Sequence, residues 1–170
     1  MKLSALLLLI VALSAHGNVF FDSPSVTAEG QDLKYRDASG RIHTSPRVEG
    51  QVRFSGPRVS ANGRFLGWLA EFPTCCTSYP VALQLVVMDK GKRLTTFSGP
   101  QAIFGWCFSP NSRAVVYRQE ALHGPTDHVF EMRSVRSGNL IRRFVLPLQG
   151  PESQAQRGQL PNWAKCAAYE

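Results

Sequence analysis

Short apolar segments separated by turn residues run along the chain from about residue 33 onwards. Phe65–Ala70, Leu83–Met88 and Val129–Val135 are typical of them, rich in the valine, leucine and aromatic residues that favour strands. Apolar residues at helical spacing are hard to find, and turn residues recur too often to leave room for long helices. Leu83–Met88 is apolar on both faces of a strand, so we expect it to be covered on both sides. The pattern predicts an all-β fold of stacked sheets.

A repeat organises these segments. Val59–Arg64 resembles Phe108–Arg113, displaced by 49 positions, and a β-rich run follows each copy. Each unit continues with a variable loop (73–80 and 121–127), a strand, a tight turn and a last strand. Gly91 and Gly138 stand in these tight turns, where a hairpin needs a residue that tolerates positive φ. The sequence pattern therefore predicts four short antiparallel strands in each unit.

The order of aromatic residue, Ser-Pro-Asp-Gly-like turn, strand, loop, strand, glycine turn and strand resembles the WD40-like repeat of TolB-type β-propellers. Trp106–Arg113 and Val59–Arg64 carry the resemblance. Both copies depart from the family turn, with Asn111-Ser112 in place of Asp-Gly and Ala61-Asn62 in place of Pro-Asp. The resemblance covers residues 33 to about 166. It implies propeller-blade-like, four-stranded antiparallel sheets, and it implies no activity.

The number of units is small for a propeller. Within one domain, 18–170, we expect a partial unit (33–44), two full units (52–99 and 103–147) and a terminal strand near 160–166. A closed propeller has about four to eight blades. Two sheets could pack face to face, the terminal strands could form a partial third sheet, or two chains could complete one ring as a homodimer. We favour the monomeric two-sheet or partial-propeller form.

The first residues indicate export. Lys2 precedes the apolar stretch Leu3–Leu13, and Ala15-His16-Gly17 places small residues where a signal peptidase reads. We expect residues 1–17 to be a signal peptide and the protein to be periplasmic or secreted. No second long apolar run follows, so we expect no transmembrane segment after its removal.

The remaining chain is basic, with 18 Lys and Arg against 12 Asp and Glu once Lys2 is removed. This balance suits contact with an envelope protein or an anionic surface component, although positive charge also keeps a small domain soluble. Nucleic acid is not an expected partner, because no recognised binding motif is present.

Four cysteines are disulfide candidates: Cys75, Cys76, Cys107 and Cys166. An even number in an oxidising compartment favours structural bridges, and three pairings are open. Because Cys75 and Cys76 are adjacent, we expect at least one of them to bond a distant partner. Neither CxxC nor HxxxH occurs, so we expect no metal.

Sequence motifs for catalysis are missing. The chain contains no GxSxG, no HExxH, no EF-hand loop and no glycine-rich phosphate loop. Glu71 and Glu120 occupy equivalent positions of the two units, and paired carboxylates could hydrolyse glycosides. The same equivalence fits a shared structural role, which we favour. We expect no cofactor.

Two loops offer candidate binding residues. The 73–80 loop holds Tyr79 between prolines and beside the adjacent cysteines, and loops on a rigid sheet often form binding surfaces. The 121–127 loop and the residue after it bring His123, Asp127 and His128 into one stretch. Arg133 belongs to an arginine group on the last hairpin, with Arg136, Arg142 and Arg143, that could face an anion or solvent.

These observations favour an exported, non-catalytic binding module of the envelope or the secreted fraction. The alternative is a small secreted hydrolase that uses Glu71 and Glu120, or the group formed by His123, Asp127 and His128.

Overall fold

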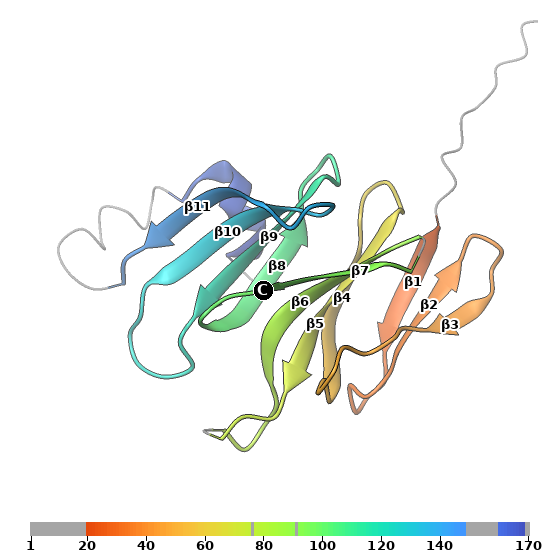
Figure 1. Ribbon diagram of the computed structural model, residues 1–170, viewed down its shortest axis with the longest axis horizontal. Coiled ribbons are helices and arrows are strands. Elements are labelled where there is room, and N and C mark those ends of the chain that lie inside the picture. Colours follow the sequence, from red (N-terminus) through yellow and green to blue (C-terminus); the bar gives the residue numbers. More distant parts are fainter. Residues whose placement is uncertain (1–19, 76, 91, 149–159, 169–170) are drawn as a thin grey trace, which may run out of the picture.

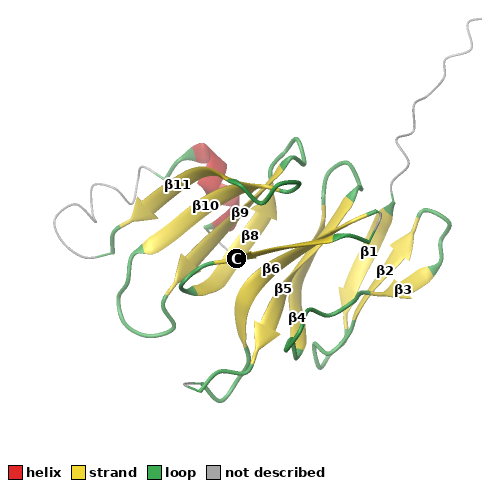
Figure 2. Cartoon of the chain, viewed as in Figure 1, coloured by secondary structure: helices red, strands yellow, loops and turns green. Residues whose placement is uncertain are grey.

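A computed structural model of the chain describes residues 20–75, 77–90, 92–148 and 160–168. The expected signal peptide, residues 1–17, lies outside the described residues. Strands make up most of the described chain, with one short helix near its C-terminal end (Figure 2). Within these ranges, no helix is long and apolar enough to cross a membrane.

The strands form three antiparallel sheets, each ordered as along the chain (Figure 1). The first sheet holds β1 (Phe21–Val26), β2 (Leu33–Asp37) and β3 (Ile42–Thr44). The middle sheet holds β4 (Arg53–Val59), β5 (Phe65–Phe72), β6 (Val81–Asp89) and β7 (Leu94–Ser98). The last sheet holds β8 (Ala102–Phe108), β9 (Ala114–Glu120), β10 (His128–Ser134) and β11 (Leu140–Leu146). The predicted all-β, propeller-blade-like fold with two full four-stranded sheets is confirmed.

The 49-residue repeat is visible in the hydrogen bonds of its turns. Ser60 Oγ accepts the backbone N–H of Phe65 at 2.9 Å and donates to Asn62 Oδ1 at 2.8 Å. Asn62 Oδ1 also accepts the N–H of Arg64 at 3.1 Å. The same three bonds, at 3.0, 2.8 and 3.1 Å, recur in the later turn among Ser109, Asn111, Arg113 and Ala114. The two turns therefore have the same conformation despite their different sequences.

Apolar side chains fill the space between neighbouring sheets. The core between the first and middle sheets contains Phe21, Leu33 and Tyr35 on one side and Trp68 and Val86 on the other. The core between the middle and last sheets is formed by Phe65, Leu69, Leu85, Val87, Phe97, Ile103, Trp106, Val115, Tyr117 and Val135. The middle sheet is thus covered on both faces, as its continuous apolar strands predicted.

Trp106 of β8 is fully buried in this second core and lies directly on the backbone of the middle sheet. Its Nε1 donates to the carbonyl oxygen of Gly56 at 3.0 Å. A Cβ added at Gly67 would lie 2.5 Å from its ring, so only glycine leaves room for the indole there.

The expected strand near residues 160–166 is wrong, because this segment contains a 3-10 helix, η2 (Asn162–Ala167). Pro161, just before η2, has no N–H for a strand ladder, and the alanine-rich sequence that follows favours a helix. Ala164 and Ala167 are fully buried and pack with Cys107, Val116 and Phe130 of the last sheet. η2 therefore covers the outer face of this sheet.

A disulfide fastens this helix to the sheet. Cys166 of η2 bonds Cys107 of β8, with the two Cα atoms 5.9 Å apart. The expectation that Cys75 or Cys76 bridges to a distant cysteine of the chain is therefore wrong, because both distant cysteines are used by this bond. Cys76 lies outside the described residues, and the adjacent Cys75 is exposed.

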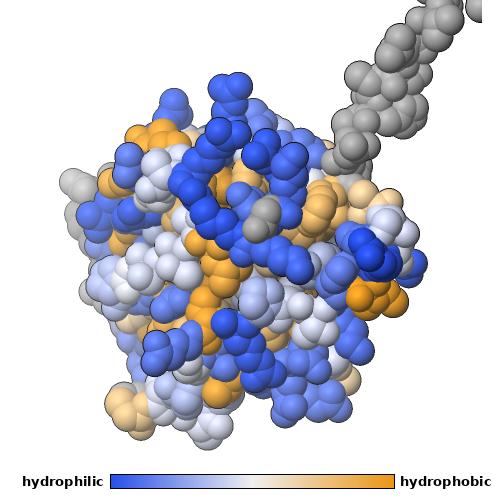
Figure 3. All heavy atoms as spheres, turned by 45° about the vertical axis from the view of Figure 1, so that its right-hand side comes forward, coloured by the Kyte–Doolittle hydropathy of each residue, from blue (hydrophilic) through white to orange (hydrophobic). Residues whose placement is uncertain are grey.

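The outer face of the first sheet is mostly polar, with Ile42 of β3 as an exposed apolar residue. Along β2, Lys34 and Arg36 are exposed while Leu33 and Tyr35 point into the core. When the β1–β3 side is turned forward, hydrophilic residues dominate the surface and apolar ones form scattered patches (Figure 3). The stack of three sheets thus ends in a polar face on one side and in η2 on the other.

Candidate functional site

The strands β5 and β9 give the middle and last sheets two distinct ends. Each strand begins after a tight repeat turn and ends in a variable loop, 73–80 or 121–127. We call the end that bears these loops the loop end (Figure 1). We call the opposite end, with the turns before β5 and β9 and the β6–β7 and β10–β11 hairpin turns, the turn end.

The loop end contains a hollow of about 580 Å³ between the two sheets. Leu83 of β6, Pro100 of the β7–β8 connection, and Leu122 and His123 of the later loop contribute to its lining. We call this the loop-end hollow. Tyr79, in the other loop, is 58% exposed. Of the predicted binding residues, the structure therefore places His123 on a hollow and Tyr79 on an exposed loop at the same end.

Asp127 and His128 do not join His123 in one site. Asp127 is exposed, and its Oδ1 accepts the N–H of Leu148 just after β11. His128 is the first residue of β10, and its Nε2 lies 2.6 Å from Glu120 Oε2. Among the residues of the described ranges, no three His, Cys, Asp or Glu side chains are grouped as a metal ion would need.

His128 and Glu120 form a half-buried pair beside a hollow of about 350 Å³. Arg118 Nε lies 3.8 Å from the Glu120 carboxylate, and Arg118 Nη1 donates to the carbonyl oxygen of Ala168. Burial is the main cause that lowers the pKa of His128 below its usual value. The negative charge of Glu120 raises this pKa, and the positive charge of Arg118 lowers it further. The pair therefore favours a neutral imidazole next to a carboxylate.

Glu71 lies in the middle sheet and Glu120 in the last, each with its own cationic neighbours. Glu71 is the cross-strand partner of Arg53, whose Nε lies 3.8 Å from the carboxylate. Glu120 has Arg118 and His128 in contact. The two positions share the role of a carboxylate paired to a base within its own sheet, which agrees with the structural interpretation.

Arg133 is engaged inside the last sheet. Its Nε donates to Glu131 Oε2 at 2.7 Å, and its Nη1 donates to the Gly138 carbonyl oxygen. The same carboxylate oxygen accepts the hydroxyl of buried Tyr117 at 2.8 Å. Burial, followed by this hydrogen bond, raises the pKa of Tyr117. The network joins β9 and β10 and leaves little of Arg133 for a ligand.

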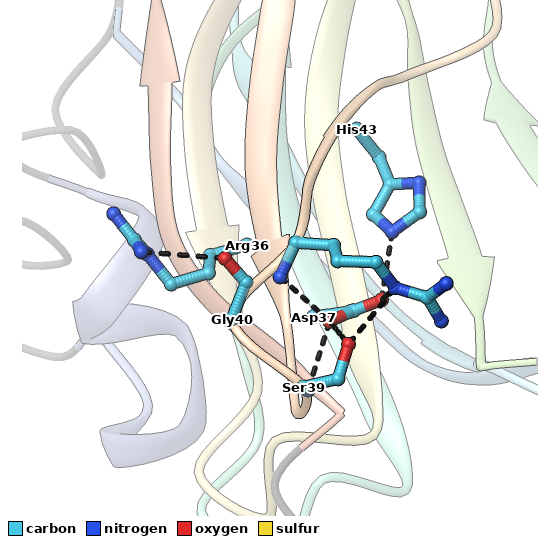
Figure 4. Close-up of polar contacts among 6 residues, drawn as sticks. Arg36, Asp37, Ser39, Gly40 and His43 are labelled. Atoms are coloured by element: carbon cyan, nitrogen blue, oxygen red, sulfur yellow. Dashed lines mark hydrogen bonds and ion pairs between the residues drawn. The ribbon is translucent and has the colours of Figure 1, made fainter.

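A second polar cluster occupies the β2–β3 hairpin (Figure 4). Asp37 Oδ1 accepts the hydroxyl and the N–H of Ser39 and the N–H of Arg41, and Asp37 Oδ2 lies 2.7 Å from His43 Nε2. The bond from Ser39, followed by the His43 contact, holds the pKa of Asp37 well below its usual range. Ser39 and His43 both contact the aspartate and not each other, so the histidine is not placed to activate the serine. The cluster fixes the hairpin turn.

A hollow of about 570 Å³ lies at the turn end, between the two repeat turns and the β10–β11 hairpin. Arg64, Arg113 and Arg136 contribute to its lining, and we call it the turn-end hollow. The sequence indicates Arg136 as part of an arginine group. It indicates Arg64 and Arg113 only as members of the two repeat turns. An arginine recurs at these equivalent positions, 49 residues apart, and this recurrence is the sequence signal that points to Arg64 and Arg113.

Comparison with known proteins gives only distant likenesses. No family model matches the chain, and neither does any curated protein. Among solved structures, Pyrococcus horikoshii acylaminoacyl peptidase has a TM-score of 0.47 at 12% identity, over 75% of this chain and 25% of that one. Kuenenia stuttgartiensis hydrazine synthase has a TM-score of 0.46 at 14% identity, over 75% of this chain and 37% of that one. The tricorn protease has a TM-score of 0.46 at 14% identity, over 88% of this chain and 17% of that one.

This chain thus spans a minor part of each of these structures. Likenesses this distant leave the function to be inferred from the chain's own residues.

Proposed function

We propose that the chain is an exported, non-catalytic binding module that contacts a partner protein through its loop end. The observation that carries the proposal is the loop-end hollow of about 580 Å³, bounded by β6, the β7–β8 connection and the 121–127 loop. The sheets beside it are rigidly packed, and loops held by such a scaffold are suited to recognition.

The surface chemistry of this end supports a protein partner. Leu83, Pro100 and Leu122 give the hollow an apolar part, while His123 adds a polar group at its edge. Exposed Tyr79 offers an aromatic side chain with a hydroxyl, the kind of residue enriched where proteins bind one another. A partner protein could therefore insert an apolar side chain into the hollow and also contact Tyr79, which lies at the same end.

The contacts of the reactive groups also favour binding over chemistry. Glu71, Glu120, Asp37 and Arg133 each lie in an ion pair within their own sheet. Ion pairs of this kind, formed within one sheet, fit a structural role for these side chains.

Export and a relationship to TolB-type propellers complete the proposal. Export is supported by the signal-like order of Lys2, Leu3–Leu13 and Ala15-His16-Gly17, and is compatible with the Cys107–Cys166 disulfide. The TolB-type relationship is supported by the equivalent turns at 60–65 and 109–114.

The test is recovery of partners from an envelope extract by the immobilised protein. The double variant Tyr79→Ala/His123→Ala should recover less partner, and Ala121→Trp should do the same because the indole fills the hollow that Ala121 helps to line. Ile42→Ala/Lys90→Ala removes an exposed apolar and an exposed polar side chain away from the loop end and should recover partners normally. Equal recovery by all three variants would exclude the loop end as the binding surface.

A hydrolase is the second candidate, favoured by one observation. Glu120 and His128 are in contact beside a hollow of about 350 Å³, where a neutral imidazole could act as a general base. Turnover of glycoside or ester substrates that is lost in both Glu120→Gln and His128→Ala would support it. Turnover that survives in either variant, or none from a broad panel, would contradict it.

A further inference from the structure

We propose that the turn-end hollow is a binding site for a phosphate ester, held by Arg64, Arg113 and Arg136. The site lies at the other end of β5 and β9 from the loop end, so it is independent of the proposed partner surface. Three features carry the inference: a fixed backbone, uncompensated positive charge and a lining of hydrogen-bond donors.

The repeat turns fix the backbone from which two of these arginines project. The N–H of Arg64 is bonded to Asn62 Oδ1 and that of Arg113 to Asn111 Oδ1, each at 3.1 Å. The N–H of Asn62 lies 3.4 Å from Ser112 Oγ, which connects the two turns. Arg64 and Arg113 are therefore equivalent residues that the stacking of two blades brings to one hollow.

The third arginine comes from the β10–β11 hairpin. The carbonyl oxygen of Arg136 accepts a bond from Arg93 Nη2 at 2.7 Å, which ties this hairpin to the β6–β7 hairpin. Arg93 lines a small adjoining recess with Arg64 and Arg136. A ligand in the turn-end hollow would thus lie close to a fourth guanidinium group.

Among the described residues, no carboxylate neutralises the positive charge of the hollow. No carboxylate contributes to its lining, and no carboxylate of the described ranges lies within 4.0 Å of the Arg64, Arg113 or Arg136 guanidinium nitrogens. Asp89 lines the adjoining recess, and its Oδ1 accepts the N–H of Arg93. Arg64 Nε is shielded from solvent and has no hydrogen-bond acceptor within the described part of the chain.

The other polar side chains of the hollow have hydrogens to donate. Asn62 and Asn111 use Oδ1 to hold the turns, so their Nδ2 groups are left to donate. The hydroxyl oxygens of Ser112 and Ser134 accept backbone N–H groups, which leaves their hydrogens available. A ligand that complements this lining accepts hydrogen bonds through several oxygens and carries negative charge.

A phosphate ester has both properties. It carries nearly two negative charges and three acceptor oxygens near neutral pH, and guanidinium forks match its geometry. A carboxylate has one charge and two oxygens, fewer than the three arginines can engage. The volume of about 570 Å³ also leaves room for the group that bears the phosphate.

The test is a titration of the full mature protein with glucose 6-phosphate at low salt, followed by calorimetry and by the NMR signals of the arginine Nε–H groups. The wild type should bind, with shifts in the Arg64, Arg113 and Arg136 signals. Arg113→Gln/Arg136→Gln should weaken binding by about tenfold or more. Both side chains are exposed, so the variant should fold, which thermal unfolding checks.

The matched control is Arg36→Gln/Arg143→Gln, which removes the same charge from exposed arginines outside the hollow. It should bind glucose 6-phosphate within about twofold of the wild type, because screened distant charges contribute little. Equal weakening in both double variants would show an effect of net charge and overturn the proposal. The proposal would also be overturned if the wild type bound neither glucose 6-phosphate at about 10 mM nor phosphatidic acid vesicles.

The phosphatidic acid vesicles distinguish a lipid headgroup from a soluble phosphate ester as the ligand. Binding to phosphatidic acid vesicles but not to glucose 6-phosphate, lost in Arg113→Gln/Arg136→Gln, assigns the site to a lipid headgroup. Binding to glucose 6-phosphate with the same dependence assigns it to a soluble ester or a phosphorylated glycan. Vesicle binding that is insensitive to these arginines contradicts the proposal.

Discussion

At the scale of single residues, the two repeat turns adopt the same left-handed backbone conformation with different residues. Gly63 and Ser112 occupy equivalent positions, and both have left-handed backbones, with φ of 63° and 57°. A residue with a Cβ is strained there by about 1–2 kcal/mol relative to glycine. Ser112 offsets part of that strain by accepting the N–H of Asn62.

Gly63→Ala is therefore expected to lower the free energy of unfolding by about 1–2 kcal/mol. Ser112→Ala should cost less, because the wild type already carries a Cβ in this conformation and loses only a long hydrogen bond. Urea unfolding of both variants measures the difference. A Ser112→Ala variant that is destabilised as much as Gly63→Ala would contradict the equivalence of the two turns.

Asp37 should make the β2–β3 hairpin sensitive to acid. Its folded-state pKa lies below the ordinary value of 3.8, so its contribution to stability is complete above that pH and is lost as the pH falls further. Asp37→Asn should be less stable than the wild type at neutral pH, and the gap in Tm should narrow as the pH is lowered to about 2. A gap that stays constant with pH would show that the charge of Asp37 contributes nothing.

The sequence could suggest the candidate residues but not their partners. His123, Asp127 and His128 are close in the chain, yet Asp127 bonds the end of β11 and His128 turns to Glu120 on the neighbouring strand. Cross-strand neighbours depend on register, which residue spacing alone does not reveal. Arg64 and Arg113 were visible as a repeated residue, but their convergence on one hollow depends on how the two sheets stack.

At the scale of elements, the central strands were predictable and the two terminal elements were not. β5 and β6 have largely apolar sequences that suit strands covered on both sides, and β9 begins with such a sequence. β1 lacks regular alternation, because Ser23 has a φ of 44° and the register shifts between Asp22 and Ser25. η2 lies where a strand was expected, although its alanines and Pro161 favour a helix.

The contact between η2 and β8 should tolerate no side chain at Gly105. A Cβ there would lie 2.5 Å from the carbonyl oxygen of Ala167, so Gly105→Ala must displace η2 or bend β8. The expected cost is about 1–3 kcal/mol of unfolding free energy, measured by urea unfolding. Ser98→Ala, on the exposed side of β7, is the control and should leave stability nearly unchanged.

The disulfide should contribute strongly because it closes a long segment of chain. Cys107 and Cys166 are 59 residues apart, for which the entropy of loop closure corresponds to about 4 kcal/mol. Cys107→Ala/Cys166→Ala should therefore unfold at a lower urea concentration than the oxidised wild type. If reduction of the wild type does not lower its stability towards that of the variant, the bond does not stabilise the fold.

At the scale of the whole molecule, the coverage of both outer faces predicts a monomer. η2 covers part of the last sheet, and the first sheet presents Lys34 and Arg36 outward. Among the described residues of these two sheets, large exposed apolar side chains are limited to Ile42 of β3, Phe104 of β8 and a few residues of β11, which we expect to be too few for ring closure with a second chain. Sedimentation should give the monomer mass at all concentrations. A mass that rises with concentration would revive the ring of two chains.

The helix η2 also covers one end of the stack of sheets. It occupies the face on which a further blade would otherwise pack, and it does so with residues that belong to no blade. We expect the number of sheets to be variable independently of the two end pieces. A variant with an additional 49-residue unit inserted at the β7–β8 connection should grow by one sheet and keep both ends, which would make this small chain an adjustable spacer.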